Sequence, residues 1–540
     1  MDKRPLTDDA RDSESWALAP PHNKNVQGLV VSGFAKQPSA RALFLEFNFD
    51  KDHKGCGWLK ALTSIAPITD ADGPDPRCAA LGFTWSGLSK MGLDAHSLDS
   101  FDRPFKEGMF QEDRLRRLGD RRGNTWSKTV IDGGPQWSGN TPLDAAAHDT
   151  TARPFHTTTD AHTNVAITTE ITVHALLLLY ADNETDVDEW TSQVTQCLAP
   201  YRVTVVRKLP LTRTRPSDGI EREHFGFADG ISQPIPFEKD VVTLSQTLAQ
   251  RHNSVHLVPL GEILMGHPNG HGELATGPVV PGKSANVSGC DPETLRPHPR
   301  GEGFLDFGFN GSYMVVRELK QDVAQFWNSM DECADALNKS VNAGTPPVNA
   351  DWVASRVMGR DRNGHLLCPG GVLPADTSGR PDNAFRFFDR DKMGYGCPLG
   401  SHVRRGNPRD GLAPSAKDKD LLLSAANHHR ILRRGRKYGP EVTDPRCADP
   451  GDPGDRGLLF ICLNTDIGRQ FEFIQQTWIL NPNFAVLHNE TDPLLGPCGA
   501  FTIPDAQLRK IIQVKSYVQM VGGEYFFLPS IAALRYLETL

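Results

Sequence analysis

The order of its apolar segments constrains the fold of this chain more than any other feature. Up to residue 207, the patterns follow the order strand, helix, strand, strand, helix, strand. They lie at residues 42–49, 58–62, 79–84, 173–180, 187–198 and 202–207. The strand segments alternate partly or form short apolar runs, and the helix segments place apolar residues on one face. This order is typical of the ferredoxin-like, or split βαβ, arrangement.

The second half of the chain repeats much of this pattern. Strand patterns lie at residues 312–317, 458–463 and 525–528, and helix patterns at 322–337 and 467–478. We therefore predict an α+β protein with two ferredoxin-like domains and antiparallel sheets. The predicted division is a flexible tail at residues 1–24, an N-terminal domain at 25–222 and a C-terminal domain with long insertions at 223–540.

Long connections separate these segments. Residues 120–160 are rich in Gly, Asp and Thr, and residues 266–305 and 361–415 are rich in Gly and Pro. Connections of this length without secondary structure are uncommon in compact domains and are usually functional. The last two bracket the candidate site.

Composition argues against several classes of protein. The net charge of −8 does not suit general nucleic-acid binding, which needs a basic surface. No apolar run reaches the roughly 18–20 residues of a membrane span, and no apolar segment of a secretory signal follows the charged N-terminus. Ten cysteines without a CxxC pair are typical of reduced thiols. We expect a soluble, cytoplasmic protein with no membrane or nucleic-acid partner, and the oligomeric state stays open.

One histidine, His402, stands between a turn bounded by Gly and Pro and a basic, turn-forming exit, within residues 396–409. A neutral imidazole is a common metal ligand, and it holds haem iron in peroxidases. Because the chain has 18 histidines, one of them in a loop is by itself more often a surface or core residue. The other reactive side chains that accompany it make it a candidate.

The first of these is Asp229, in a tight turn between Gly226 and Gly230. Glycines let the backbone pass close to a flat or bulky ligand, and the turn presents the carboxylate. The functional hypothesis is a general acid/base or a proton shuttle over a cofactor. The alternative is an ordinary Asp-Gly turn, since so short a motif is a weak signal.

The second is Arg433, in a basic run at residues 428–439. An arginine is always charged and presents a fixed fork of donors. Near a haem it could stabilise an anionic peroxide oxygen or reach a propionate. The alternatives are a solvated basic face or a local nucleic-acid patch, and the neighbouring Arg434 could be mistaken for the functional residue.

Together these segments resemble the signature sequences of dye-decolourising (DyP-type) haem peroxidases, especially the larger members with long insertions. The main matches lie at residues 225–234, 396–409 and 431–433, and shorter ones at 26–28, 104–109, 261–266 and 522–527. They follow the order of the family and extend over roughly residues 25 to 535.

The resemblance implies a haem b (iron protoporphyrin IX) in the C-terminal half. It assigns His402 as the axial metal ligand, Asp229 as the distal acid/base and Arg433 as the second distal catalytic residue, which also contacts the cofactor. The further cofactor-binding residues that it implies are Gly230, Ile231, Ser232, Gln233, Leu458 and Phe460.

A ligating histidine needs an acceptor on its other ring nitrogen. Glu490, Asp492 and Glu524 are candidates for this role, and the sequence does not choose among them.

The implied function is that of a peroxidase, a donor:hydrogen-peroxide oxidoreductase. It would reduce hydrogen peroxide through compound I and oxidise phenolic and dye-type substrates, so the expected partners are hydrogen peroxide and small aromatic reductants. An aspartate, with an ordinary pKa of about 3.9, stays ionised over most of the acidic range, whereas a histidine begins to charge near about 6.5. We therefore predict an acidic optimum with dyes.

Two other functions stay open. One is a haem-binding or haem-handling protein in which peroxidase activity is incidental. The other is a metal hydrolase with clustered His and Asp, which would show no Soret band. The sequence also leaves open whether a surface Trp or Tyr relays electrons to large substrates.

Overall fold

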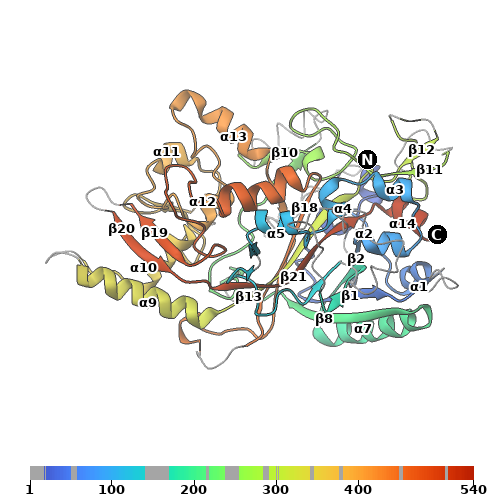
Figure 1. The fold of residues 1–540 in the computed structure, drawn as a ribbon, viewed down its shortest axis with the longest axis horizontal. Helices are drawn as coiled ribbons and strands as arrows, with labels where there is room; N and C mark the ends of the chain where they lie inside the picture. The colour runs from blue at the N-terminus through green and yellow to red at the C-terminus, as the bar shows by residue number, and fades with distance from the viewer. Residues whose placement is uncertain are drawn as a thin grey trace.

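The fold is known from a computed structural model. It describes residues 18, 20–49, 57–73, 75–123, 125–139, 169–214, 218–237, 255–283, 291–299, 301, 303–340, 346–375, 381–448, 454–504 and 509–540. Within these residues, helices surround a central set of long strands, as Figure 1 shows.

Four strands of the N-terminal half form an antiparallel array. They are β1 (Ser39–Phe47), β2 (Cys78–Phe83), β7 (Ala175–Ala181) and β8 (Val203–Thr212). Their spatial order is β8-β1-β7-β2, with helices α1 (Trp58–Ile65) and α7 (Glu184–Leu198) as the two crossovers. Figure 1 shows α7 running along strands β1 and β8. This is the predicted split βαβ arrangement.

The C-terminal half repeats the arrangement. Its strands are β13 (Ser312–Gln321), β17 (Arg436–Tyr438), β18 (Gly457–Asn464) and β21 (Val518–Leu528). Their order is β17-β18-β13-β21, and the short β16 (Leu432–Arg433) also pairs with β18. The prediction of two ferredoxin-like units with antiparallel sheets is therefore confirmed, while the domain boundary at residues 222–223 stays a prediction.

The two arrays join at both edges. Strand β8 pairs with β17 at Thr212 and Lys437, and β2 pairs with β21 at Phe83 and Phe527. The eight strands therefore close into a ring, which leaves none of them as a free edge for pairing with another chain.

Side chains alternate between the two faces of this ring. On β1, Phe44 points into a core between the two arrays, together with Val316 and Phe526 of the C-terminal half. Leu43 and Leu45 point the other way and pack in the core that contains helices α1 and α7. Register is thus fixed because both faces of the strands are buried.

The remaining helices and strands vary in length, and α9 is the longest of them. The helices are α2 (Trp85–Lys90), α3 (Ala95–Asp99), α4 (Arg103–Glu107), α5 (Glu112–Arg117), α9 (Val323–Ser340), α10 (Ala350–Met358), α11 (Phe387–Asp391), α12 (His402–Gly406), α13 (Lys419–Asn427) and α14 (Ile531–Leu537). The minor strands are β3 (Arg121–Arg122), β4 (Thr125–Trp126), β5 (Trp137–Ser138), β6 (Ile171–Thr172), β9 (Ile235–Phe237), β10 (Leu257–Pro259), β11 (Val279–Pro281), β12 (Phe304–Asp306), β14 (Leu367–Cys368), β15 (Gly371–Val372), β19 (Gly499–Ile503) and β20 (Lys510–Val514).

The helix predicted at residues 467–478 forms, but as a π-helix in two segments, η7 (Gly468–Glu472) and η8 (Ile474–Ile479). Its hydrogen bonds span five residues, as from Glu472 N–H to Ile467 C=O. Such helices occur frequently at functional sites, and residues of both segments line the cavity described below.

Three stretches that were predicted to be irregular contain secondary structure. The predicted tail at 1–24 falls mostly on residues outside the described part, but residues 22–24 form a 3₁₀ helix in which Asn23 is buried. Residues 361–415 contain helices α11 and α12, and residues 121–138 contain strands β3, β4 and β5, whereas 140–168 lie outside the described residues. None of the described helices combines the length and apolar character that crossing a bilayer requires.

Buried polar groups hold the two arrays together, and Glu318 is central among them. Its carboxylate is fully buried and accepts hydrogen bonds from Trp137 Nε1 (2.8 Å) and Arg207 Nε (2.9 Å), as well as from the Arg207 Nη2. Strand β13 of one array is thus connected to β8 of the other.

Replacing Glu318 by Ala should destabilise the protein by about 3–5 kcal/mol, because it leaves a largely buried guanidinium without its counter-charge. The melting temperature should fall by several degrees. The matched control is Glu332→Ala, because Glu332 is 63% exposed and pairs with an exposed lysine. An exposed pair is worth about 0–1 kcal/mol, so equal melting temperatures for the two variants would contradict the assignment.

Candidate active site

A cavity of about 320 Å³ lies in the C-terminal half of the chain. Its wall is mostly apolar and includes Phe225, Phe227, Leu319, Met358, Phe385, Phe387, Phe471, Ile474, Trp478, Leu494 and Leu495. All the site residues predicted from the sequence line it: Asp229, Gly230, Ile231, Ser232, Gln233, His402, Arg433, Leu458 and Phe460. Residues from 225 to 495 thus meet at one site.

His402 begins the short helix α12, and local contacts fix its position. The backbone N–H groups of Gly396 and Cys397 donate to the buried carboxylate of Asp391 (3.0 and 2.8 Å) and hold the preceding turn. A side chain at Gly396 would meet the backbone of Cys368, because a Cβ there would lie 2.2 Å from its carbonyl carbon. The glycine is therefore required by close approach.

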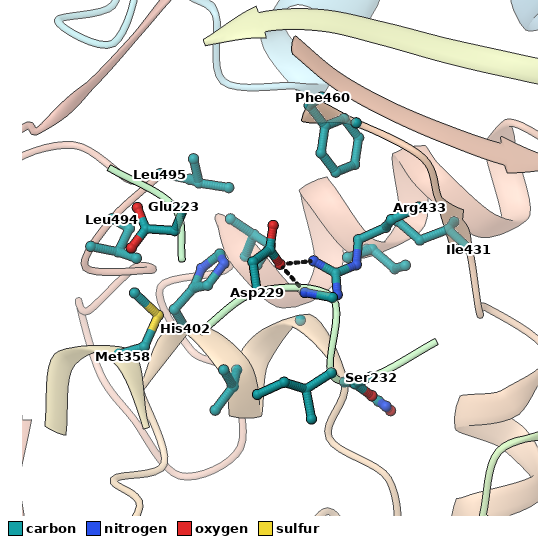
Figure 2. Close-up of a pocket in the computed structure, with 18 of the residues that line it drawn as sticks. Glu223, Asp229, Ser232, Met358, His402, Ile431, Arg433, Phe460, Leu494 and Leu495 are labelled. Carbon is teal, nitrogen blue, oxygen red and sulfur yellow. Dashed lines mark hydrogen bonds and ion pairs between the residues drawn. The ribbon is translucent and has the colours of Figure 1, made fainter. Parts of the chain in front are cut away.

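The His402 ring is anchored by Asp492. Its Nδ1 lies 2.9 Å from Asp492 Oδ2, while Asp492 Oδ1 accepts the N–H groups of Leu494 and Leu495 (both 2.9 Å). Because the carboxylate accepts from Nδ1, the other nitrogen, Nε2, is the one available to a ligand in the cavity. Figure 2 shows the imidazole and the Asp229 carboxylate pointing into the same space.

Of the three acids that the sequence offered as partners, Asp492 is therefore the one that contacts His402. Glu490 instead accepts from Thr502 N–H (2.8 Å), and Glu524 accepts from Met109 N–H (2.8 Å) and Gly139 N–H (3.0 Å).

The contact between His402 and Asp492 shifts the pKa of both side chains. Burial opposes the charged form of His402, but the adjacent Asp492 outweighs it, so the pKa of His402 lies above its ordinary value. Burial likewise opposes ionisation of Asp492, yet His402 and the two N–H donors hold its pKa below the ordinary value. Asp492 is thus an ionised carboxylate, which makes the imidazole a stronger electron donor.

Arg405 connects α12 to the segment that carries Asp492. Its Nη1 donates to the carbonyl oxygens of Trp478 (2.7 Å) and Asn481 (3.0 Å). Its Nη2 donates to the carbonyl oxygen of Glu490 (2.6 Å), two residues before Asp492. The distance between His402 and Asp492 is thereby fixed by a fully buried side chain.

Asp229 lies in a tight turn between two glycines, as the sequence predicted. Gly226 and Gly230 both have positive φ angles, 93° and 73°, which favour glycine. The turn is held by Glu223, whose carboxylate accepts the N–H groups of Phe225 (2.8 Å) and Phe227 (2.9 Å). Burial raises the pKa of Glu223 to about 7.

Arg433 faces Asp229, with 3.0 Å between its Nη1 and Asp229 Oδ1. The amide of Gln233 holds the Arg433 backbone by accepting its N–H (3.1 Å) and donating to its C=O (3.2 Å). The side chain of Asp229 is 42% exposed and that of Arg433 is 34% exposed, both on the cavity wall. Figure 2 shows them beside Phe460.

This pair sets the ionisation of Asp229. Burial favours the neutral acid, but the Arg433 guanidinium and the Gly230 N–H outweigh it, so the pKa of Asp229 lies below its ordinary value. The ion pair therefore favours the carboxylate form of Asp229.

Two other basic residues of this segment, Arg434 and Arg436, point away from the cavity. Arg434 donates to the carbonyl oxygens of Leu29 and Val30 (2.8 and 2.9 Å), and Arg436 donates to those of Gly33 and Phe34 (both 2.8 Å). The alternative of a solvated basic face is thus wrong for these two residues, because both are buried.

One end of the cavity is strongly cationic. Arg360, Arg409 and Arg430 all line it, and each is at most 6% exposed. Arg360 and Arg409 each donate to Asn383 Oδ1 (both 2.8 Å). Burial lowers the pKa of Arg360 and of Arg430 to about 10, so both guanidinium groups lack full compensation.

Several buried polar atoms at the cavity have no partner among the described residues. They are both terminal nitrogens of Arg430, the side-chain oxygen and nitrogen of Asn407, and Ser232 Oγ. Buried polar groups nearly always have a hydrogen-bond partner, so the donors among these atoms, on Arg430, Asn407 and Ser232, indicate a bound group with acceptor oxygens. An apolar wall, an available imidazole nitrogen and a cationic end together fit a haem with two propionates.

Sequence reasoning missed the three arginines. Arg409 lies inside the predicted motif at residues 396–409, so its position was a usable signal. Arg430 had no such signal, because it belongs to a basic run that indicated a solvated surface. The metal-hydrolase alternative requires clustered ligands, and the described ranges contain no group of three or more His, Cys, Asp or Glu side chains that could hold a metal ion.

Comparison with known proteins finds relatives that are dye peroxidases. The chain is 29% identical over 380 residues to the multifunctional dye peroxidase DyP2 of Amycolatopsis sp., covering 68% of this chain and 71% of that protein. It is 27% identical over 553 residues to a dye-decolorizing peroxidase of Mycena epipterygia, covering 94% and 86%. No family model matches the chain.

Solved structures agree in fold. A DyP-type peroxidase of Anabaena sp. superposes with a TM-score of 0.68 at 24% identity, covering 96% of this chain and 94% of the other. A dye-decolorizing peroxidase in complex with 2,6-dimethoxyphenol superposes with a TM-score of 0.64 at 24% identity, covering 97% and 100%.

Replacing Asp492 by Asn should lower the pKa of His402 below that of the unchanged protein, because the hydrogen bond can persist but the negative charge is lost. Replacing it by Ala should lower the pKa further, below the ordinary value, because burial, the largest influence, then loses the main group that opposes it. NMR titration of the His402 ring in haem-free protein measures both effects. Asp389→Ala, at an acid paired with Lys419 on the surface, is the control, and an unchanged His402 pKa in both Asp492 variants would refute the coupling.

Proposed function

The chain belongs to the dye-decolourising (DyP-type) peroxidase family, and from that premise we propose that it is a haem b peroxidase that reduces hydrogen peroxide and oxidises small phenolic and dye-type reductants. The observation that carries this proposal is one cavity that combines a carboxylate-supported imidazole, His402, with the ion pair of Asp229 and Arg433. The peroxide reacts first and the reductant second, as the resemblance implies.

In this proposal the chain binds the cofactor through two kinds of contact. His402 Nε2 would bind the haem iron, while Asp492 accepts the hydrogen bond of the other ring nitrogen. Arg430, Arg409, Ser232 and Asn407 bind the propionates, since their side chains lie at the cationic or unpartnered end of the cavity. Bound haem supplies a redox-active iron that takes up the oxidising equivalents of peroxide.

Asp229 acts as the acid/base. Because its pKa is held low, the carboxylate is ready to accept the proton of the peroxide oxygen nearest to it. It then returns that proton to the other oxygen as the O–O bond breaks, so that this oxygen leaves as water while bound haem would supply the two electrons. A carboxylate held on a tight turn reaches both oxygens without leaving its position.

Arg433 stabilises the charge that develops during this transfer. Its guanidinium is fixed through the Gln233 clamp on its backbone and presents several N–H donors to an anionic oxygen. The apolar side chains of Leu458 and Phe460 on the same wall limit water near these groups.

The reductants are proposed to be small aromatic molecules. A structural neighbour of this chain binds 2,6-dimethoxyphenol, and the mostly aromatic and aliphatic cavity wall suits such rings. The cytoplasmic location remains a prediction from sequence.

The visible spectrum and the peroxide reaction of the haem-loaded protein test this function. The unchanged protein should show a Soret band, which His402→Ala should weaken or lose and added imidazole should restore. Asp229→Asn should keep the band but react with peroxide about 10²–10⁴ times more slowly, the usual worth of a general acid/base. A haem-handling protein with incidental activity would instead lose little in Asp229→Asn, and that result would refute the proposal.

The acidic limit of activity should depend on Arg433. In Arg433→Leu the positive charge is lost while burial remains, so the pKa of Asp229 rises and kcat/KM for peroxide falls at higher pH than in the unchanged protein. Arg433→Lys keeps a charge and should shift the limit less. The measurement is kcat/KM for peroxide from about pH 3 to 7, and an acidic limit that stays fixed or moves lower in Arg433→Leu would contradict the role of this pair.

A further inference from the structure

A second imidazole, that of His429, lines the same cavity and has no role in the mechanism above. It lies between helix α13 and strand β16, two residues before Ile431, which Figure 2 shows beside Arg433. Its ring stacks on Phe473 with 3.7 Å between ring centres and 4° between planes, and meets the ring of Trp478 at 85°. The orientation of the imidazole is therefore fixed.

The hydrogen-bond pattern of His429 defines its tautomer. Its Nδ1 lies 2.6 Å from the carbonyl oxygen of Arg469, which can only accept, so Nδ1 carries the hydrogen. Nε2 then holds the free lone pair, and it has no hydrogen-bond partner within the described ranges. A backbone-anchored imidazole with an open Nε2 is arranged to accept a proton or a hydrogen bond.

The surroundings of His429 favour the neutral imidazole. Burial lowers the pKa of His429 and outweighs the hydrogen bond to the Arg469 carbonyl, which acts in the opposite direction. The neutral ring keeps the lone pair on Nε2. The apolar side chains of Ile431, Ile474 and Trp478 line the same cavity as the imidazole and can receive an aromatic ring.

We propose that His429 Nε2 is the proton acceptor for phenolic reductants, which bind with their ring against Ile431, Ile474 and Trp478 and their hydroxyl toward the imidazole. This inference rests on the proposed peroxidase function. It assigns a phenol subsite and a catalytic base distinct from Asp229, which serves the peroxide.

The proposed step is balanced in atoms and charge. The phenol loses one electron to the peroxide-oxidised haem, and its O–H bond breaks as the proton passes to Nε2, which leaves a neutral phenoxyl radical. Two phenols supply the two electrons and two protons with which one hydrogen peroxide becomes two waters. A phenol that is losing an electron is strongly acidic, so a weak base suffices, and the nearby Arg469 favours release of the proton afterwards.

Three variants of the haem-loaded protein separate the contributions of this ring. His429→Phe keeps a stacked aromatic ring but has no acceptor. His429→Gln keeps an acceptor for a hydrogen bond but cannot take up the proton. His428→Phe is the matched control, because His428 lies near Glu262 (3.6 Å) and stacks on His271 without lining the cavity.

Two ratios are measured in each variant. The first compares kcat/KM for 2,6-dimethoxyphenol with kcat/KM for ABTS, a dye that gives up an electron without losing a proton. The second compares the Kd, by calorimetry on the resting enzyme, of 2,6-dimethoxyphenol with that of its methyl ether, 1,2,3-trimethoxybenzene, which has no hydroxyl to donate.

In His429→Phe the first ratio should fall about 10²-fold, and the preference for the phenol in binding should fall about fivefold, the worth of one hydrogen bond. His429→Gln should lose the rate ratio but keep the binding preference, and His428→Phe should keep both. Soret bands and melting temperatures confirm that each variant is folded and loaded.

Unchanged ratios in His429→Phe, with ABTS oxidation intact, would overturn the phenol subsite alone. Equal losses with phenol and with ABTS would also overturn it, since they would mean a structural effect. Absence of ABTS oxidation by the unchanged, haem-loaded protein would instead overturn the proposed function on which the inference rests.

Discussion

The site depends on the contact between the imidazole of His402 and the buried carboxylate of Asp492. A buried charge without a partner is strongly unfavourable, so the two groups hold each other in place and in a defined ionisation state. They belong to segments 90 residues apart, and Arg405 fixes the separation of these segments through backbone carbonyls. One nitrogen of the imidazole is thereby occupied and the other is left for a ligand, which is the condition for an axial position.

Arg433 and Asp229 are also held in place by contacts with other segments of the chain. Arg433 lies on strand β16, which pairs with β18, and Gln233 fixes its backbone from the turn that carries Asp229. Arg434 and Arg436, next along the chain, donate to carbonyls of residues 29–34 in the N-terminal half. No described residue before 223 lines the cavity, but the N-terminal half holds the strand that positions one of its charged groups.

Sequence reasoning predicted what depends on local pattern. The strand order could be predicted because each strand is marked by partial alternation or by a short apolar run, and the glycines of the Asp229 turn show where the backbone must adopt positive φ. The choice of Asp492 over Glu490 and Glu524 could not be predicted from the sequence. All three are buried acids, and only the tertiary structure decides which one contacts His402. Arg430 and His429 were missed for a related reason. Both belong to a basic, polar run that indicated solvent exposure, and only the packing of α13 against the π-helix segment turns them inward.

The most direct test of this account is the anomalous scattering of iron in crystals of the haem-loaded protein. The account predicts one iron peak within bonding distance of His402 Nε2, with the side chains of Asp229 and Arg433 on the opposite face of the porphyrin and its propionates at the Arg409 and Arg430 end. An iron peak bound to a different residue, or Asp229 and His402 on the same face of the porphyrin, would contradict it.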